Sequence, residues 1–183
     1  MTTGITASGT FYSYNKIEGS IPIVFIHGVG LTNEIWEPQL EFFKKYSTIS
    51  YDILGHGKSK LEKKDISFDD FSNQLIDLID ELKINKIHLV GFSIGSLIAR
   101  NFATKFNNRL KSLILLGSIY KRTEQQQKIV SDRYNQAKQE LKLSKQALKR
   151  WFTDEYLEKN PNTYEKISSI ISANNMQNFL KVY

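Results

Sequence analysis

The stretch Ile87-His88-Leu89-Val90-Gly91-Phe92-Ser93-Ile94-Gly95 decides the fold of this chain. It begins with a run of residues typical of a buried strand, and the segment 94–106 that follows has a helical pattern. Between them lies a G-x-S-x-G motif, in the strand–turn–helix setting that this motif requires. Such a turn holds its serine at a positive φ and lifts the hydroxyl above the edge of the sheet. The sequence therefore predicts that Ser93 is a nucleophile.

The residues around Ser93 support this interpretation. Gly91 and Gly95 leave room for the helix to pack closely against neighbouring strands. The amino end of that helix adds a positive dipole end where negative charge would develop on a substrate oxygen. The alternative is an ordinary strand–helix turn with an incidental serine, which the surrounding pattern disfavours.

Two further glycine-rich motifs follow two other predicted strands. His27-Gly28-Val29-Gly30 comes directly after the apolar run Ile21–Ile26. Its glycines allow a backbone N–H to approach a substrate closely. The second motif follows the strand expected over Tyr46–Ile53 and has the form D-x-x-G-H-G-x-S, with Asp52, Gly55, His56 and Gly57 as its defining residues.

Strand patterns alternate with helical patterns up to Gly117, which predicts a parallel sheet with crossover helices. Beyond Gly117 there is no convincing strand. We therefore expect an α/β core over residues 1–120 and an all-helical block over residues 121–183. The remaining expected elements are helices over Glu34–Tyr46, Ser67–Leu82, Ile94–Phe106, Gln125–Leu141, Lys145–Phe152 and Tyr164–Ser172, and strands over Lys86–Phe92 and Leu110–Leu116.

With these motifs in order, the chain resembles the α/β-hydrolase fold superfamily over essentially all of residues 1–183. Phe25–Ser59 is similar to 3-oxoadipate enol-lactone hydrolases and related serine esterases, and residues 147–153 (ALKRWFT) resemble a segment in the cap of that group. The resemblance implies an α/β fold with a mostly parallel sheet and a helical cap over 121–183. It also implies hydrolysis of a small ester or lactone without a metal or cofactor.

The resemblance assigns roles by position. Ser93 would be the nucleophile, and the backbone N–H groups of Val29 and Ile94 would form the oxyanion hole. His27 and His56 would play structural parts in their loops. His88 lies within the strand before Ser93 and is expected to be packed and hydrogen-bonded.

The triad order Ser–Asp–His implied by the family places the acid and the histidine beyond the cap. All three histidines of the chain precede Ser93, and Asp132 and Asp154 match no acid position. We therefore expect a fragment, truncated after the cap begins and short of roughly 55–60 residues of strand–helix units. Such a chain would be inactive and aggregation-prone, with Leu110–Leu116 as an unpaired sheet edge.

The composition excludes several kinds of site and disfavours some partners. The absence of cysteine among 183 residues excludes disulfides, thiolate metal sites and a cysteine nucleophile. That absence fits a cytoplasmic location, and no signal peptide or membrane-spanning run is apparent. The net charge of +6 is scattered along helical patterns, mostly in residues 121–183, which favours a solvated surface over nucleic-acid binding. The expected partner is a small molecule, and the oligomeric state stays open.

Other functions stay open at this point. Carbon–carbon bond hydrolases, cofactor-free haloperoxidases and some lyases share these motifs, and fold similarity does not separate them. Haloalkane dehalogenases and epoxide hydrolases are disfavoured because they have Asp where Ser93 stands. A non-catalytic relative that binds a ligand or a protein is a further alternative, although such a protein has little reason to retain a strained serine.

Overall fold

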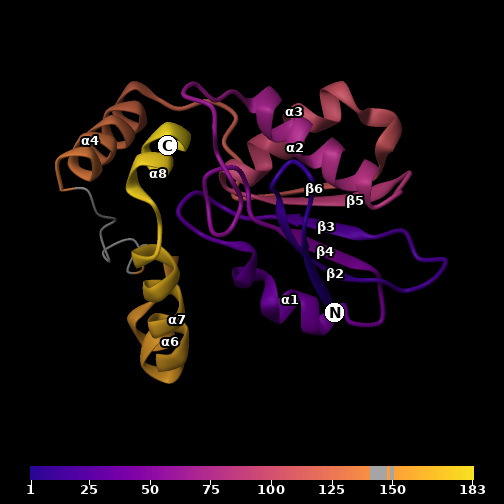
Figure 1. The fold of residues 1–183 in the computed structure, drawn as a ribbon. Helices are drawn as coiled ribbons and strands as arrows, with labels where there is room; N and C mark the ends of the chain where they lie inside the picture. The colour runs from indigo at the N-terminus through magenta and orange to yellow at the C-terminus, as the bar shows by residue number, and fades with distance from the viewer. Residues whose placement is uncertain (141–147, 149–150) are drawn as a thin grey trace.

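A computed structural model gives the structure of the chain and describes residues 1–140, 148 and 151–183. Its centre is a six-stranded mixed sheet with helices on both faces (Figure 1). This confirms the expected α/β class. The strands are β1 (Thr2–Ile5), β2 (Phe11–Asn15), β3 (Ile23–Ile26), β4 (Thr48–Tyr51), β5 (Ile87–Phe92) and β6 (Leu110–Leu116).

The strand order is β1-β2-β4-β3-β5-β6. β4, β3, β5 and β6 are parallel to one another, as the alternating pattern predicts, whereas β1 and β2 form an antiparallel ribbon along β4. The sequence analysis missed β1 and β2. Both strands are short and rich in Thr, Ser and Tyr, and their partly exposed residues lack the apolar run that marks the central strands.

Helices α2 (Phe68–Glu81) and α3 (Ile94–Lys105) cover one face of the sheet. Helix α2 begins with a capping box between Ser67 and Asp70, and it buries an apolar stripe against β3, β4 and β5. The expected helix over Ser67–Leu82 is therefore present. The core on this face is made of fully buried aliphatic and aromatic side chains.

The opposite face carries the short helix η1 (Asn33–Trp36) and helix α1 (Glu37–Phe42). The single helix expected over Glu34–Tyr46 is wrong, because the segment is split and α1 ends at Phe42. Pro38 explains the break, since proline has no N–H to continue a preceding helix and is favoured in the first turn of a new one.

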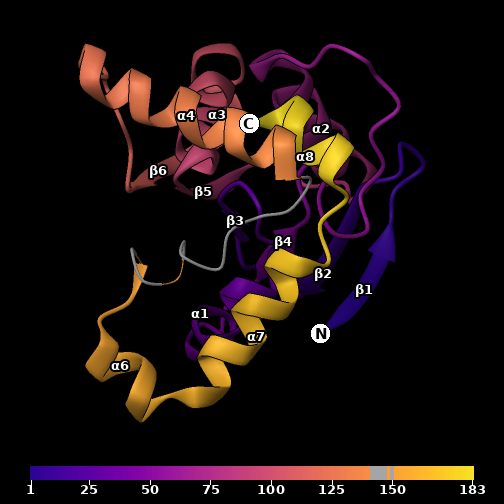
Figure 2. The ribbon, with the colours of Figure 1, turned by 90° about the vertical axis from the view of Figure 1, so that its left-hand side faces the viewer.

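The C-terminal helical segment (residues 124–140, 148 and 151–183) lies beside the sheet, near the loops that follow β3 and β4 (Figures 1 and 2). It comprises α4 (Glu124–Glu140), α6 (Asp154–Lys159), α7 (Pro161–Ser172) and α8 (Met176–Val182). As expected, its described residues form no strand. Helix α7 begins at Pro161, before the expected Tyr164, and neither α6 nor α8 was predicted. Most of the helix expected over Lys145–Phe152 lies outside the described residues.

No described helix combines the length and the hydrophobicity that crossing a lipid bilayer would need.

Candidate active site

Ser93 occupies a strained turn between β5 and α3. Its φ of 56° and ψ of −120° lie in a region that residues with a Cβ rarely adopt. Backbone bonds hold the turn, because Ser93 N donates to Leu116 O at 2.9 Å while Ser96 N and Oγ donate to Ser93 O at 2.9 and 2.6 Å. The expected positive-φ turn is thus observed.

Gly91 and Gly95 allow the close packing that the turn needs. A Cβ on Gly91 would lie 2.2 Å from the carbonyl oxygen of Gly95, and one on Gly95 would lie 2.5 Å from that of Ile26. The first turn of α3 therefore contacts the backbones of β5 and β3 directly. No other residue type fits without moving the helix.

The loop after β3 reaches the same place. A Cβ on Gly28 would lie 3.3 Å from the Cβ of Ser93, so the His27–Gly30 loop and the serine turn are in contact. Val29 and Ile94, the expected oxyanion donors, are the residues directly after these two contacting positions. The structure thus brings the His27–Gly30 motif and the G-x-S-x-G motif together.

His27 and His56 tie the loops after β3 and β4 to each other. His27 Nε2 accepts from Ile53 N at 3.0 Å, and His56 Nε2 accepts from Gly30 N at 2.9 Å. Their Nδ1 atoms lie 2.8 Å from Gly28 O and 3.3 Å from Leu54 O. Because each Nε2 accepts, each Nδ1 carries the proton and donates to its carbonyl.

Both rings are neutral, and neither is free to act as a base. Burial lowers the pKa of His27 to about 4, against the opposing effect of its Gly28 hydrogen bond. Burial and the nearby His27 lower the pKa of His56 to about 3, opposed by the Leu54 hydrogen bond and by Asp52. With both nitrogens of each ring engaged in structural bonds, these histidines organise the loops.

The other residues considered as triad members, His88, Asp132 and Asp154, also have no contact with Ser93 among the hydrogen bonds of the described residues. His88 Nδ1 lies 2.7 Å from Ser112 Oγ on β6, so His88 is hydrogen-bonded as expected. It lies on β5 five residues before Ser93, about 16 Å away at the rise of an extended strand. Asp132 is an exposed residue of α4 and Asp154 begins α6. All three histidines lie among the described residues, and none of them is placed as a base for Ser93.

Asp52 is buried and organises the loop after β4. Its Oδ1 accepts from both Asn33 N and Asn33 Nδ2 at 2.8 Å, and its Oδ2 accepts from Lys58 N at 2.9 Å. A carboxylate with three donors and no access to solvent is a structural anchor. This explains why the motif begins with Asp.

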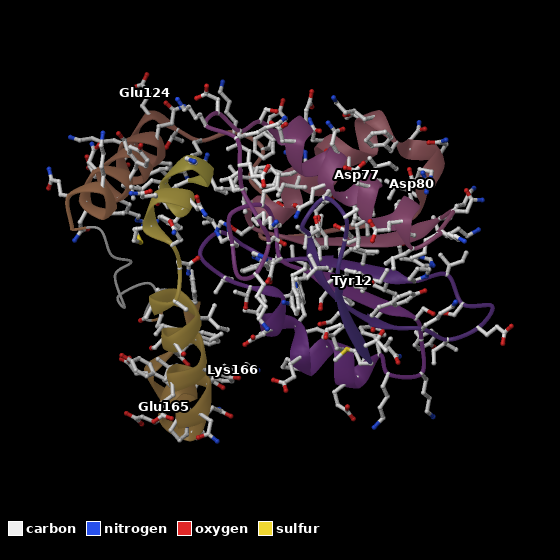
Figure 3. The ribbon with its side chains drawn as sticks, viewed as in Figure 1. Tyr12, Asp77, Asp80, Glu124, Glu165 and Lys166 are labelled. Carbon is white, nitrogen blue, oxygen red and sulfur yellow. The ribbon has the colours of Figure 1, made fainter. Side chains whose placement is uncertain are left out.

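The C-terminal helical segment packs against these loops and against α1. Asn174 Nδ2 donates to Gly30 O at 2.9 Å, the Phe179 ring lies 6.4 Å from that of His56, and Lys166 pairs with Glu37 (Lys166 is labelled in Figure 3). An apolar cluster also joins the two parts and includes Phe92, the neighbour of Ser93. Its members are Leu31, Ile35, Phe92, Leu148, Phe152, Ile167, Ile170 and Ile171.

Sequence reasoning missed Asn33 and Asn174. Each acts through a partner far along the chain, Asp52 in the first case and Gly30 in the second, so no local pattern marks them. Within the described part of the chain, no three His, Cys, Asp or Glu side chains are grouped in a way that could hold a metal ion.

The chain belongs to the α/β hydrolase fold family, whose model matches residues 21–162. Among curated proteins it is 32% identical over 183 residues to the (E)-2-((N-methylformamido)methylene)succinate hydrolase of Acinetobacter baylyi, covering all of this chain and 68% of that protein. It is 26% identical over 158 residues to 3-oxoadipate enol-lactonase 2 of the same organism, covering 86% of this chain and 59% of the relative.

Solved structures agree on the fold. The enol-lactonase of Burkholderia xenovorans superposes with a TM-score of 0.81 at 22% identity, covering 94% of this chain and 68% of the other. A hydrolase from Pseudomonas aeruginosa gives a TM-score of 0.83 at 20% identity, covering 98% and 69%. The chain therefore spans about two thirds or less of the length of these four proteins.

Proposed function

We propose that Ser93 is the nucleophile of a hydrolase that cleaves a carboxylic ester or lactone through an acyl-enzyme. The observation that supports this most directly is the strained Ser93 backbone, held against the glycine loop after β3. Strain of this kind costs on the order of 1–3 kcal/mol, and it is retained where it places a reacting group.

In the proposed reaction the Ser93 hydroxyl attacks the substrate carbonyl carbon and a histidine base accepts its proton. Negative charge then develops on the carbonyl oxygen, where the N–H groups of Val29 and Ile94 would donate. Each such donor lowers the barrier by about 3 kcal/mol. The leaving oxygen takes the proton back, and water hydrolyses the acyl-enzyme.

The base is proposed to come from outside these 183 residues. His27 and His56 have both ring nitrogens occupied, and His88 lies well below the turn on β5. Since a serine without its base keeps an ordinary hydroxyl, we expect the chain by itself to turn over no ester.

We propose further that the C-terminal helical segment is a cap over Ser93 that selects a small substrate. The apolar cluster around Phe92 would contact the uncharged part of that substrate. The names of two relatives denote substrates built on the dicarboxylates succinate and adipate. Together with the surplus of basic residues after residue 120, this favours a substrate that carries a carboxylate.

The test is covalent labelling by a fluorophosphonate. Residues 1–183 are fused to the third of the Acinetobacter succinate-derivative hydrolase that lies outside the match, and folding is verified by circular dichroism. Mass spectrometry should find one adduct, on Ser93, that is absent in Ser93→Ala and retained in the control Ser118→Ala. A folded fusion that reacts equally well after Ser93→Ala contradicts the proposal.

A further inference from the structure

Polar side chains line the α1 face of the sheet where β2 and β4 are paired. Ile49 and Tyr51 of β4 are buried in the apolar cluster of the opposite face. The alternation of a strand therefore directs Thr48 and Ser50 to the α1 face. Ser13 of β2 is the register partner of Ser50 and lies on the same face. Because β3 and β5 contribute apolar side chains to this face, the sheet carries a polar region beside an apolar one.

A pocket of about 510 Å³ lies over this polar region. Its walls come from the sheet, from η1 and α1, and from α7, whose Lys166 is labelled in Figure 3. Thr48 and Ser13 line it from the sheet, and Asn33 and Leu40 line it from η1 and α1. Pockets of about 300–1,000 Å³ are the usual size for binding small molecules.

The sheet side of the pocket has hydroxyl groups that the described residues leave unsatisfied. Thr48 is completely buried, and its Oγ1 has no hydrogen-bond partner among the described residues. Ser13 Oγ donates to Asn33 Oδ1 at 3.4 Å, which is longer than the roughly 2.7–2.8 Å common for hydroxyl donors. A buried hydroxyl without a partner is unfavourable, and a polar group that enters the pocket would relieve this cost.

The exposed charged side chains that line the pocket are mostly paired with one another. Lys44 pairs with Glu41, and Lys166 pairs with Glu37, so both lysines already have an acidic partner. Glu34 also lines the pocket, is exposed, and forms no ion pair with any described residue. Its carboxylate can accept strong hydrogen bonds from the hydroxyl groups of a ligand.

We propose that this pocket is a second binding site, for a neutral polyhydroxylated molecule of about the size of a monosaccharide. One hydroxyl of the ligand bonds Thr48 Oγ1, and a second bonds Ser13 Oγ. A third donates to the Glu34 carboxylate. Leu40 supplies an apolar contact for the carbon atoms of the ligand. A charged ligand fits less well, because the carboxylates and ammonium groups around the pocket largely offset each other.

The pocket is separate from the proposed nucleophile. Thr48 begins β4 and is level with His88 across β3, whereas Ser93 follows the end of β5. Since β3, β4 and β5 are parallel, Thr48 and Ser93 lie at opposite ends of these strands. The inference concerns binding and does not depend on the reaction proposed for Ser93.

The test is saturation-transfer NMR on the 183-residue chain, repeated on the fusion described above. Glucose, sorbitol and myo-inositol are each added at about 10 mM. At least one of these neutral polyols should bind, whereas cyclohexanol, which has a single hydroxyl, should not. Glucosamine and glucuronate, which are charged, should bind less well than glucose or not at all. The proposal is overturned if none of the three polyols binds, or if cyclohexanol or a charged sugar binds better than they do.

Variants locate the site. Thr48→Val keeps the shape of the side chain and removes a hydroxyl that has no partner, so the chain should fold normally and bind the polyol about fivefold or more weakly. Glu34→Gln, at an exposed position, should weaken binding by a similar factor. The control Glu62→Gln, at an exposed position outside the pocket, should leave binding unchanged, and so should Ser93→Ala. Unchanged binding in both pocket variants, or loss of binding in Ser93→Ala, would place the ligand elsewhere and overturn the proposal.

Discussion

The loops after β3 and β4 and the edge strand β6 border the same serine turn, yet they are built in opposite ways. In the loops, His27, Asp52 and His56 are buried, and each has identified hydrogen-bond partners within the chain. In β6, apolar side chains remain exposed and one backbone edge is free. The described residues therefore organise the proposed oxyanion side of the site themselves, whereas on the other side of the serine turn they form no strand beyond β6.

The largest expected effect is on the contact between the start of α3 and β3. Gly95→Ala places a Cβ 2.5 Å from Ile26 O, a backbone atom that cannot move without displacing β3. We expect a loss of at least about 4 kcal/mol in the free energy of unfolding, or no folding at all. Urea unfolding followed by circular dichroism measures it.

Gly19 serves as a control that separates the cost of a steric clash from the cost of backbone strain. Gly19 has a φ of +72°, but a Cβ there would meet no atom within 4 Å. Gly19→Ala should therefore cost only about 1 kcal/mol, the price of left-handed backbone. Similar losses for the two alanine variants would show that α3 does not depend on its close contact with β3.

The next effect is a dependence of stability on pH. The folded pKa values of His27 and His56, about 4 and about 3, lie below the ordinary value near 6.5. The unfolded chain therefore binds more protons below pH 6.5, so stability is complete above that pH and falls as the pH drops toward 4. Between pH 7 and pH 5 we expect a loss of roughly 2 kcal/mol for each histidine.

Urea unfolding at pH 7, 6 and 5 measures this loss. His56→Gln retains an acceptor for Gly30 N but does not titrate, so this variant should lose about half of the pH dependence. An unchanged slope in His56→Gln would assign the effect to groups other than the buried imidazoles.

A third prediction compares the two regions with the same side chain. Leu89 and Leu113 are register partners on adjacent strands, but Leu89 is completely buried whereas Leu113 is 37% exposed. Leu89→Ala should cost about 3 kcal/mol and Leu113→Ala about 1 kcal/mol. Equal costs would mean that Leu113 is as well packed in solution as Leu89.

The serine turn could be predicted from the sequence because its determinants are local. Gly91, Ser93 and Gly95 lie within five residues, and the strand before them and the helix after them are strongly patterned. The place of β6 at an edge of the sheet was expected from the resemblance to the family and not from a local pattern. β1 and β2 could not be predicted in the same way, because β2 pairs with β4 more than thirty positions away and β1 pairs only with β2.

For the candidate site, the sequence placed the residues but not the contacts between them. The motifs identified His27 and His56, yet only the fold shows that each ring binds the loop of the other motif. The pKa shifts follow from burial, which no local pattern reveals.

The smallest expected effect tests whether the C-terminal helical segment helps to hold the loop after β3. Asn174 Nδ2 donates to Gly30 O across 144 residues of sequence, and it also donates to Ile170 O and Ile171 O in the last turn of α7, just before it. Asn174→Ala removes these bonds and should cost about 1 kcal/mol. Its specific signature is faster hydrogen exchange at residues 28–31. In the control Gln177→Ala, an exposed position on α8, exchange at these residues should stay unchanged. Unchanged exchange in both variants would show that the loop after β3 is held by His56 alone, so that the helices cover the site without shaping it.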